Sequence, residues 1–315
     1  MFGKNLNPLY TTMNTLQVGH SIQRKKNFRM QYTRTLFTKL VSPLTIIVRK
    51  HCITAGIALI LALCTGCVSL NTIVGGLSDV NIFTDAEELQ FGKEFVAQHE
   101  QKIKLYRDPV VTNYINDLGQ SLVRHSKRND IPYTFKVVDT KGVNAYAVPG
   151  GFIYIHLDLI RTAKTESELA AVLGHEIGHI VGRHSMKRLT QVYGIEILKQ
   201  LILNEDSSEL KKLVTEVLAA GLLFRYSRDH ERESDAYGVQ NVYDAGIAPE
   251  GAAAFFETLR AMQRSEPSTL EKFLRTHPVP SERVLNVRKQ INGLPPKSGL
   301  RTDSVQFQQI KRRIR

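Results

Sequence analysis

Apolar residues recur at helical spacing through most of the chain after residue 80. The clearest repeat follows Thr165, where leucine, valine and isoleucine return every three or four residues. Thr165 and Glu168 are spaced as the two members of a capping box, so the pattern predicts a buried helix of about 20 residues that begins here. Gly174, Gly178 and Gly182 lie four apart on it, which predicts that another element packs closely against this stripe.

Four further segments have the same helical period. A second capping box opens a predicted helix over 84–103, and an amphipathic helix is predicted over 108–126. Two apolar helices, 192–204 and 207–223, are joined by a polar connector. We expect this pair to pack in the core, and a contact with the membrane or with the substrate is the alternative.

Three short segments are instead rich in valine, isoleucine, phenylalanine and tyrosine, and glycine-containing turns separate them. These features predict strands at 135–139, 144–148 and 152–155. Three strands among so many helices predict a predominantly helical α+β fold, with a small β-sheet packed on the helix that begins at Thr165. The sequence shows no internal repeat.

The buried helix contains an H-E-x-x-H pattern, formed by His175, Glu176 and His179. Residues four apart lie on one face of a helix, so the two imidazoles could bind one metal ion. Glu176 directly follows His175 and therefore lies beside this face of the helix, where it could take a proton from a metal-activated water. This arrangement is typical of zinc hydrolases. The alternative is a pair of core histidines bonded to carbonyl groups.

A second polar cluster supplies a further candidate ligand. Glu231 and Asp235 are four apart and therefore share a helical face. A catalytic zinc needs a third protein ligand, which Glu231 could provide, and Asp235 could accept the other ring N–H of a ligating histidine. Alternatively, this is a solvated helix in which Arg228 and Arg232 pair with the two carboxylates.

Together these motifs resemble the zinc metallopeptidase family that includes HtpX, the CAAX prenyl endopeptidases, the mitochondrial Oma-type proteases and the BepA and LoiP proteins. The resemblance covers about residues 80–292. One position departs from the family pattern, because Ser234 stands where alanine is usual. The segments that carry the resemblance are 144–151, 174–179, 227–235 and 276–278 with Arg283.

The resemblance implies a zincin-like metallopeptidase domain (an HExxH gluzincin) with one Zn²⁺ on His175, His179 and Glu231, and with Glu176 as general base. It also implies that an edge strand beside the metal helix binds extended substrate through main-chain hydrogen bonds. The residues expected on that strand are Asn144, Tyr146 and Val148.

His277 is the remaining catalytic candidate. Because Pro278 follows it, its backbone is biased towards a turn. The resemblance places it near the active site, where it either stabilises the oxyanion or occupies the fourth metal position and keeps the enzyme inactive. A loop histidine without a role is the alternative. Tyr226 or Tyr237 could also donate to the oxyanion, although nothing separates them from packing tyrosines.

The other histidines near the motifs are not expected to be ligands. His184 follows His175 by nine residues, which on one continuous helix would place it on the opposite face. His230 is expected to point elsewhere, and His156 is expected at the surface or at the end of a strand.

The first part of the chain is a candidate targeting segment. Residues 1–50 contain nine lysines or arginines and no acidic residue, and an eleven-residue apolar run follows at 53–63. The run is too short to span a bilayer, which takes about 20 residues. Together with the small residues before Cys67, these features resemble a bacterial lipoprotein signal with Cys67 as the lipidated residue. A mitochondrial transit peptide with an inner-membrane anchor is the alternative.

The predicted organisation is a signal segment at 1–66, a linker at 67–80, a zinc metallopeptidase domain at 81–292 and a basic, disordered tail at 293–315. All three cysteines lie before residue 68, so the domain must bind zinc with histidine and carboxylate. Net charge is +12 for the whole chain but about +3 without the basic leader. The high charge therefore indicates targeting and gives no reason to expect a nucleic-acid partner.

The sequence thus predicts a zinc-dependent endopeptidase that cleaves protein or peptide substrates in the bacterial cell envelope, in protein quality control. The expected location is the periplasm, on the outer membrane through a lipid anchor. Two alternatives remain: a non-catalytic envelope chaperone or scaffold that keeps zinc for folding, and a mitochondrial inner-membrane protease of the Oma type.

Overall fold

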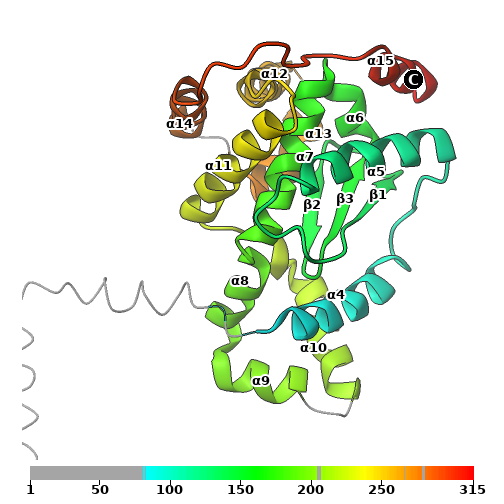
Figure 1. Ribbon diagram of the computed structural model, residues 1–315. Helices are drawn as coiled ribbons and strands as arrows, with labels where there is room; N and C mark the ends of the chain where they lie inside the picture. Colours follow the sequence, from blue (N-terminus) through cyan, green and yellow to red (C-terminus); the bar gives the residue numbers. More distant parts are fainter. Residues whose placement is uncertain (1–80, 82, 204–206, 266, 279–280) are drawn as a thin grey trace, which may run out of the picture. The chain divides into compact units, whose positions relative to one another are not determined.

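A small sheet and the helix α7 (Glu166–Val181) form the centre of the structure (Figure 1). The arrangement confirms the predicted fold class, a mainly helical α+β domain whose sheet packs on the H-E-x-x-H helix. The computed structural model describes residues 81, 83–203, 207–265, 267–278 and 281–315, all in one structural unit.

The sheet has the spatial order β1-β3-β2, in which β1 runs parallel to β3 and β2 runs antiparallel to it. β2 is therefore an edge strand. Gly150 and Gly151 make the turn from β2 to β3 at φ of 81° and 91°, angles that glycine adopts without steric cost. The strands lie within one residue of their predicted ranges, at Thr134–Val138 (β1), Ala145–Val148 (β2) and Phe152–His156 (β3).

Successive side chains of β2 point to opposite faces of the sheet, where they pack into two separate layers of the core. Ala145 and Ala147 face the layer that contains α5 and α7. Tyr146 and Val148 face the other layer, to which α4 and α10 contribute their buried side chains. These flanking helices span Asp85–His99 (α4), Pro109–Val123 (α5) and Ser207–Ala220 (α10).

Helix α11 (Arg228–Asp244) packs directly against α7. A Cβ atom added to Gly174 would lie 3.1 Å from the Cα atom of Gly238, and one added to Gly178 would lie 2.7 Å from the carbonyl oxygen of Ser234. A side chain at position 178 would clash with the backbone of α11, and one at position 174 would force the helices slightly apart, so the predicted close packing is confirmed at both positions. The contact brings the acidic residues of α11 next to the histidines of α7.

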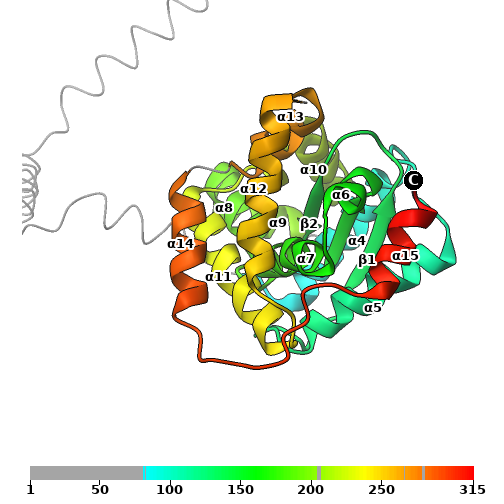
Figure 2. The same ribbon diagram turned by 90° about the horizontal axis from the view of Figure 1, so that it is seen from above.

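The other helices complete the fold around this pair. α7 ends at Val181, earlier than predicted, because Arg183 adopts a left-handed conformation (φ 53°) and the chain turns into α8. α12 packs on α7 and α14 packs on α11 (Figure 2). The remaining bounds are Leu157–Thr162 (α6), His184–Tyr193 (α8), Ile195–Leu203 (α9), Leu222–Phe224 (η1), Glu250–Ser265 (α12), Pro267–Thr276 (α13) and Ser281–Asn292 (α14).

The basic composition of 293–315 predicts a disordered tail, and this prediction is wrong. Helix α15 (Val305–Arg313) forms within it, and the chain between α14 and α15 crosses the start of α7. Glu166, the first residue of α7, accepts hydrogen bonds from Ser304 and from Arg301 Nε, the latter at 2.5 Å. Three apolar side chains at helical spacing anchor the tail in the core: Phe307, Ile310 and Ile314.

The predicted signal segment, the linker and Cys67 lie outside the described residues. Within the part of the chain that the structure describes, no helix has both the length and the apolar character needed to cross a membrane.

Candidate active site

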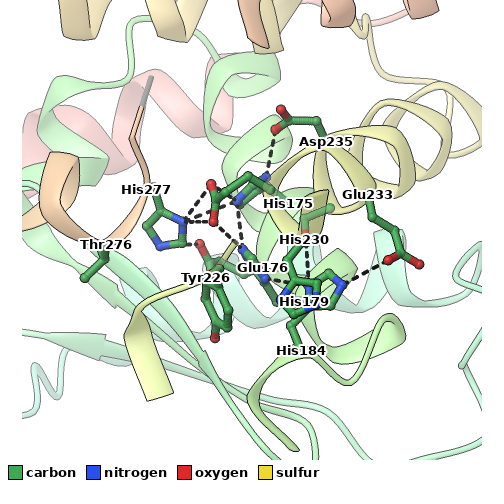
Figure 3. Close-up of polar contacts among 12 residues, drawn as sticks. His175, Glu176, His179, His184, Tyr226, His230, Glu233, Asp235, Thr276 and His277 are labelled. Atoms are coloured by element: carbon green, nitrogen blue, oxygen red, sulfur yellow. Dashed lines mark hydrogen bonds and ion pairs between the residues drawn. The ribbon is translucent and has the colours of Figure 1, made fainter. Parts of the chain in front are cut away.

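Four side chains from three parts of the fold converge on one point (Figure 3). His175 and His179 come from α7, Glu231 from α11, and His277 from the turn after α13. Each offers one ligand atom, and the four atoms lie within 4.8 Å of one another. Only the side chain of His175 has appreciable exposure, at 12%, so the cluster is closed to solvent.

The three predicted ligands have the separations that a zinc ion requires. The two Nε2 atoms of His175 and His179 lie 3.0 Å apart, and the Glu231 oxygens lie 3.5 Å and 3.4 Å from them. Ligands about 2.1 Å from a tetrahedral zinc lie about 3.4 Å from one another. Two imidazole nitrogens and one carboxylate oxygen are also typical zinc donors. The residues present therefore fit zinc.

Asp235 lies behind His175, as the spacing of the two acidic residues predicts. Its Oδ1 is 2.9 Å from His175 Nδ1, the ring nitrogen that faces away from the ligand cluster. Burial acts to raise the pKa of Asp235, but Arg283 and His175 together outweigh it, so that pKa is lowered. The carboxylate therefore stays ionised, and it can hold the proton of His175 on Nδ1 and leave Nε2 free for a metal.

Arg283, from α14, links the two acidic residues of α11. Its Nε and Nη2 atoms donate to Asp235 at 2.8 Å and 2.7 Å, and its Nη1 donates to Glu231 Oε2 at 2.6 Å. The sequence shows an arginine in the downstream element but gives no indication of these partners. They exclude the alternative of a solvated helix, because Glu231 and Asp235 are buried and pair with Arg283 rather than with neighbours on their own helix.

Glu176 has the environment of a general base. Both carboxylate oxygens are buried without a hydrogen-bond partner of normal geometry among the described residues, and Oε1 lies 3.7 Å from His277 Nε2. Burial raises its pKa, against the influence of His277, His175 and the Ala147 backbone. A carboxyl with a raised pKa beside a metal-binding cluster is suited to accept a proton during catalysis.

The two ring nitrogens of His277 face different groups, the metal ligands and Glu176. Its Nδ1 lies 3.2 Å from Glu231 Oε1 and 3.4 Å from His175 Nε2, so this nitrogen belongs to the ligand cluster. Its Nε2 is buried and faces Glu176, and it has no hydrogen-bond partner within the part of the chain that the structure describes. The backbone leaves α13 in a turn before Pro278, as predicted.

The edge strand β2 lies beside the metal helix α7, and its pairing with β3 determines which of its backbone groups remain free. The amide of His156 donates to the Asn144 carbonyl at 2.9 Å, so these two residues form a hydrogen-bonded antiparallel pair. By alternation the backbone groups of every second residue then face β3. Ala145 and Ala147 are left to face the free edge. The predicted substrate-strand residues are those that face β3: Asn144, Tyr146 and Val148.

The structure also places the other histidines. His184 Nδ1 lies 2.9 Å from His179 Nδ1, because the turn at Arg183 ends the helix on which a half-turn separation was expected. His230 stacks on His184 with ring centroids 4.3 Å apart. His156 is the last residue of β3, which agrees with the expected place at the end of a strand, and it is buried with its Nδ1 3.0 Å from the Gly142 carbonyl.

Neither candidate tyrosine directs its hydroxyl at the ligand cluster. The ring of Tyr226 stacks on His179 with centroids 3.8 Å apart, and its hydroxyl lies 3.0 Å from the hydroxyl of Ser185. The hydroxyl of Tyr237 donates to Glu233 at 3.0 Å. Tyr226 therefore contacts the metal site through its ring.

An apolar pocket adjoins the cluster on the side of α12 and α13. His175 and Glu176 form one wall of it. The rest is mostly aromatic and aliphatic, and includes Ala171, Val172, Phe255, Phe256 and Phe273.

The fold and this cluster define the class, a zinc metallopeptidase of the H-E-x-x-H type. Residues 109–291 match Peptidase family M48, which is more than half of the chain, and the protein belongs to that family. The family uses zinc, and the resemblance predicted from the sequence is confirmed.

Individual relatives support the same assignment. The beta-barrel assembly-enhancing protease of Escherichia coli (strain K12) is 29% identical over 232 residues, which cover 70% of this chain and 47% of the relative. The protein of that name from Yersinia pestis is 31% identical, over 67% of this chain and 45% of its own length. The mitochondrial metalloendopeptidase OMA1 of Schizosaccharomyces pombe is 26% identical, over 62% and 58%. The chain spans about half the length of the first two relatives.

Proposed function

We propose that this protein is a zinc-dependent endopeptidase that cleaves protein or peptide substrates. His175, His179 and Glu231 would hold the zinc. The observation that carries the proposal is Glu176, a buried carboxylate directly beside three donor atoms spaced for one metal ion; among the described residues neither of its oxygens has a hydrogen bond of normal geometry. Membership of Peptidase family M48 supports it.

The chemistry divides between the metal and the protein. Zinc, when bound, lowers the pKa of a water molecule and polarises the scissile carbonyl. Glu176 takes the proton from the attacking water and later gives it to the leaving amine. Asp235 and Arg283 keep His175 and Glu231 in position.

The substrate would lie extended along the free edge of β2. The backbone groups of Ala145 and Ala147 face that edge, where they would form main-chain hydrogen bonds with the substrate. A side chain of the substrate near the scissile bond would enter the apolar pocket beside Glu176. These features favour unfolded or locally extended protein segments as substrates.

His277 supplies the fourth donor in the closed arrangement described here. Its Nδ1 lies within 3.5 Å of donor atoms on two of the three ligands, a position that water must take for cleavage. On this proposal the closed form is latent, and His277 must withdraw. Stabilisation of the oxyanion by His277 is the alternative that the sequence also leaves open.

A non-catalytic zinc protein is the second candidate function. Four protein donors are typical of structural zinc sites, and His277 makes a fourth available. The buried Glu176 beside the cluster argues against this candidate, because a structural site has no use for a buried base.

The proposed location is the bacterial cell envelope, with attachment to the outer membrane through lipid on Cys67 and a role in quality control of envelope proteins. The basic leader, the short apolar run and the bacterial beta-barrel assembly-enhancing relatives support this. The similarity to a mitochondrial metalloendopeptidase supports the alternative of the mitochondrial inner membrane. Incorporation of radiolabelled palmitate, lost in Cys67→Ser, would identify the lipoprotein.

Cleavage of casein tests the catalytic proposal. The zinc-loaded protein should cleave it in a chelator-sensitive way, and Glu176→Gln should bind zinc but cleave nothing. His277→Ala is measured alongside, so that a latent wild type is recognised. Cleavage that survives Glu176→Gln in either background would refute the assigned base.

A further inference from the structure

The two histidines of α7 are supported in different ways. His175 Nδ1 faces the carboxylate of Asp235, whereas His179 Nδ1 faces a second imidazole, that of His184, at 2.9 Å. His184 is fully buried. Its other ring nitrogen, Nε2, lies 3.2 Å from Glu233 Oε2 on α11 (Figure 3). A run of polar contacts therefore leads from His179 through His184 to Glu233.

The proton positions in this run follow from the chemistry of a ligating histidine. If His179 uses the Nε2 lone pair for zinc, its proton is on Nδ1 and points at His184. His184 must accept that proton at its own Nδ1, so its single proton is on Nε2. From there it donates to Glu233. Each hydrogen bond in the series fixes the direction of the next.

The local backbone and the neighbouring rings determine the position of His184. A Cβ atom added to Gly182 would lie 2.2 Å from His184 Nε2, so only glycine leaves room for the ring. Arg183 takes a left-handed conformation that turns His184 back towards His179. On the other side the ring of His230 stacks on it at 4.3 Å with an interplanar angle of 10°. Gly182 thus accommodates this histidine, whereas Gly174 and Gly178 pack against α11.

We propose that His184 is a positioning residue for the metal ligand His179: it fixes the Nδ1–H tautomer and so aims Nε2 at the zinc. This inference rests on the proposed metal site and adds a residue that the H-E-x-x-H pattern does not contain. Loss of a group that orients a ligating histidine weakens metal binding by about 10–100-fold.

Two substitutions of nearly equal shape test the hydrogen bond. His184→Asn retains an acceptor oxygen near the position of Nδ1, whereas His184→Leu has no polar atom, and both lose the ring and its contact with Glu233. We expect the zinc dissociation constant of the full chain, measured by competition with a chromogenic chelator, to rise about 10–100-fold in His184→Leu. His184→Asn should bind zinc close to wild type.

Ser234→Ala is the matched control. The Ser234 hydroxyl lies 3.2 Å from the same His184 nitrogen, so its removal changes the surroundings of His184 but leaves the contact with His179. Its zinc affinity should equal that of wild type. The melting temperatures of the metal-free proteins separate folding effects from metal affinity. Equal zinc affinities for His184→Leu and His184→Asn, whether high or low, would overturn the proposal.

The tautomers of the zinc-loaded wild type give a test that requires no variant to fold. Long-range ¹H–¹⁵N NMR spectra should show a protonated Nδ1 on His179 and a protonated Nε2 on His184. A proton on His184 Nδ1 would contradict the assignment. If the wild type binds no zinc at all, the proposed function fails first; if it binds zinc and only these expectations fail, the role of His184 alone is wrong.

Discussion

Arg283 binds both carboxylate oxygens of Asp235, from Nε to Oδ2 at 2.8 Å and from Nη2 to Oδ1 at 2.7 Å. The same guanidinium donates to Glu231, so one side chain of α14 fixes both acidic residues of α11. Because Asp235 in turn contacts His175, Arg283 supports two of the proposed zinc ligands without touching the metal position.

Arg283→Met should therefore destabilise the protein strongly. Removal of the arginine leaves two carboxylates buried without their cation, which typically costs about 3–5 kcal/mol of unfolding free energy. Urea denaturation of the metal-free protein measures this. Arg232→Met is the control, because Arg232 pairs with Asp229 and Glu282 at the surface and should cost at most about 1 kcal/mol. Equal losses in the two variants would contradict the assigned role of Arg283.

His277→Ala should raise the rate of casein cleavage. The substitution removes the fourth donor from the closed cluster and so opens the position that the attacking water needs. The measurement compares initial rates at saturating zinc in wild type, His277→Ala and the double variant with Glu176→Gln, which should be inactive. A fall of about 10²–10³-fold in His277→Ala would instead indicate a donor to the oxyanion.

Phe307→Ala should destabilise the domain although it lies in a basic tail beyond the family match. Phe307 is fully buried, and truncation of a buried phenylalanine costs about 3–5 kcal/mol. Val305→Ala is the matched control on the same helix, because Val305 is 75% exposed and should change stability by no more than about 0.5 kcal/mol. If both variants unfold at the same urea concentration as wild type, α15 does not pack as described.

The sequence predicts those parts of the site whose residues are spaced along one helix. His175 and His179 share a face of α7, and Glu231 and Asp235 share a face of α11, so the 3.6-residue period is sufficient to propose each pair. The strands were also predictable, because their composition and the Pro-Gly-Gly turn are local signals.

The features of the structure that the sequence did not predict depend on how separate elements pack against one another. The position of His184 follows from a left-handed residue at Arg183, and an extrapolated helix places it on the wrong side. The backbone direction of Ala145 and Ala147 depends on the register with β3, which a one-residue shift reverses. In the tail, the many basic residues suggested disorder, although three apolar residues among them are buried in the core.

The most direct test of the account is anomalous diffraction at the zinc absorption edge from crystals of the zinc-loaded protein. We expect one strong peak about 2.0–2.2 Å from the Nε2 atoms of His175 and His179 and from a carboxylate oxygen of Glu231. A zinc peak elsewhere, or a Glu231 side chain turned away from the two histidines, would contradict the proposed metal site and the peptidase mechanism built on it.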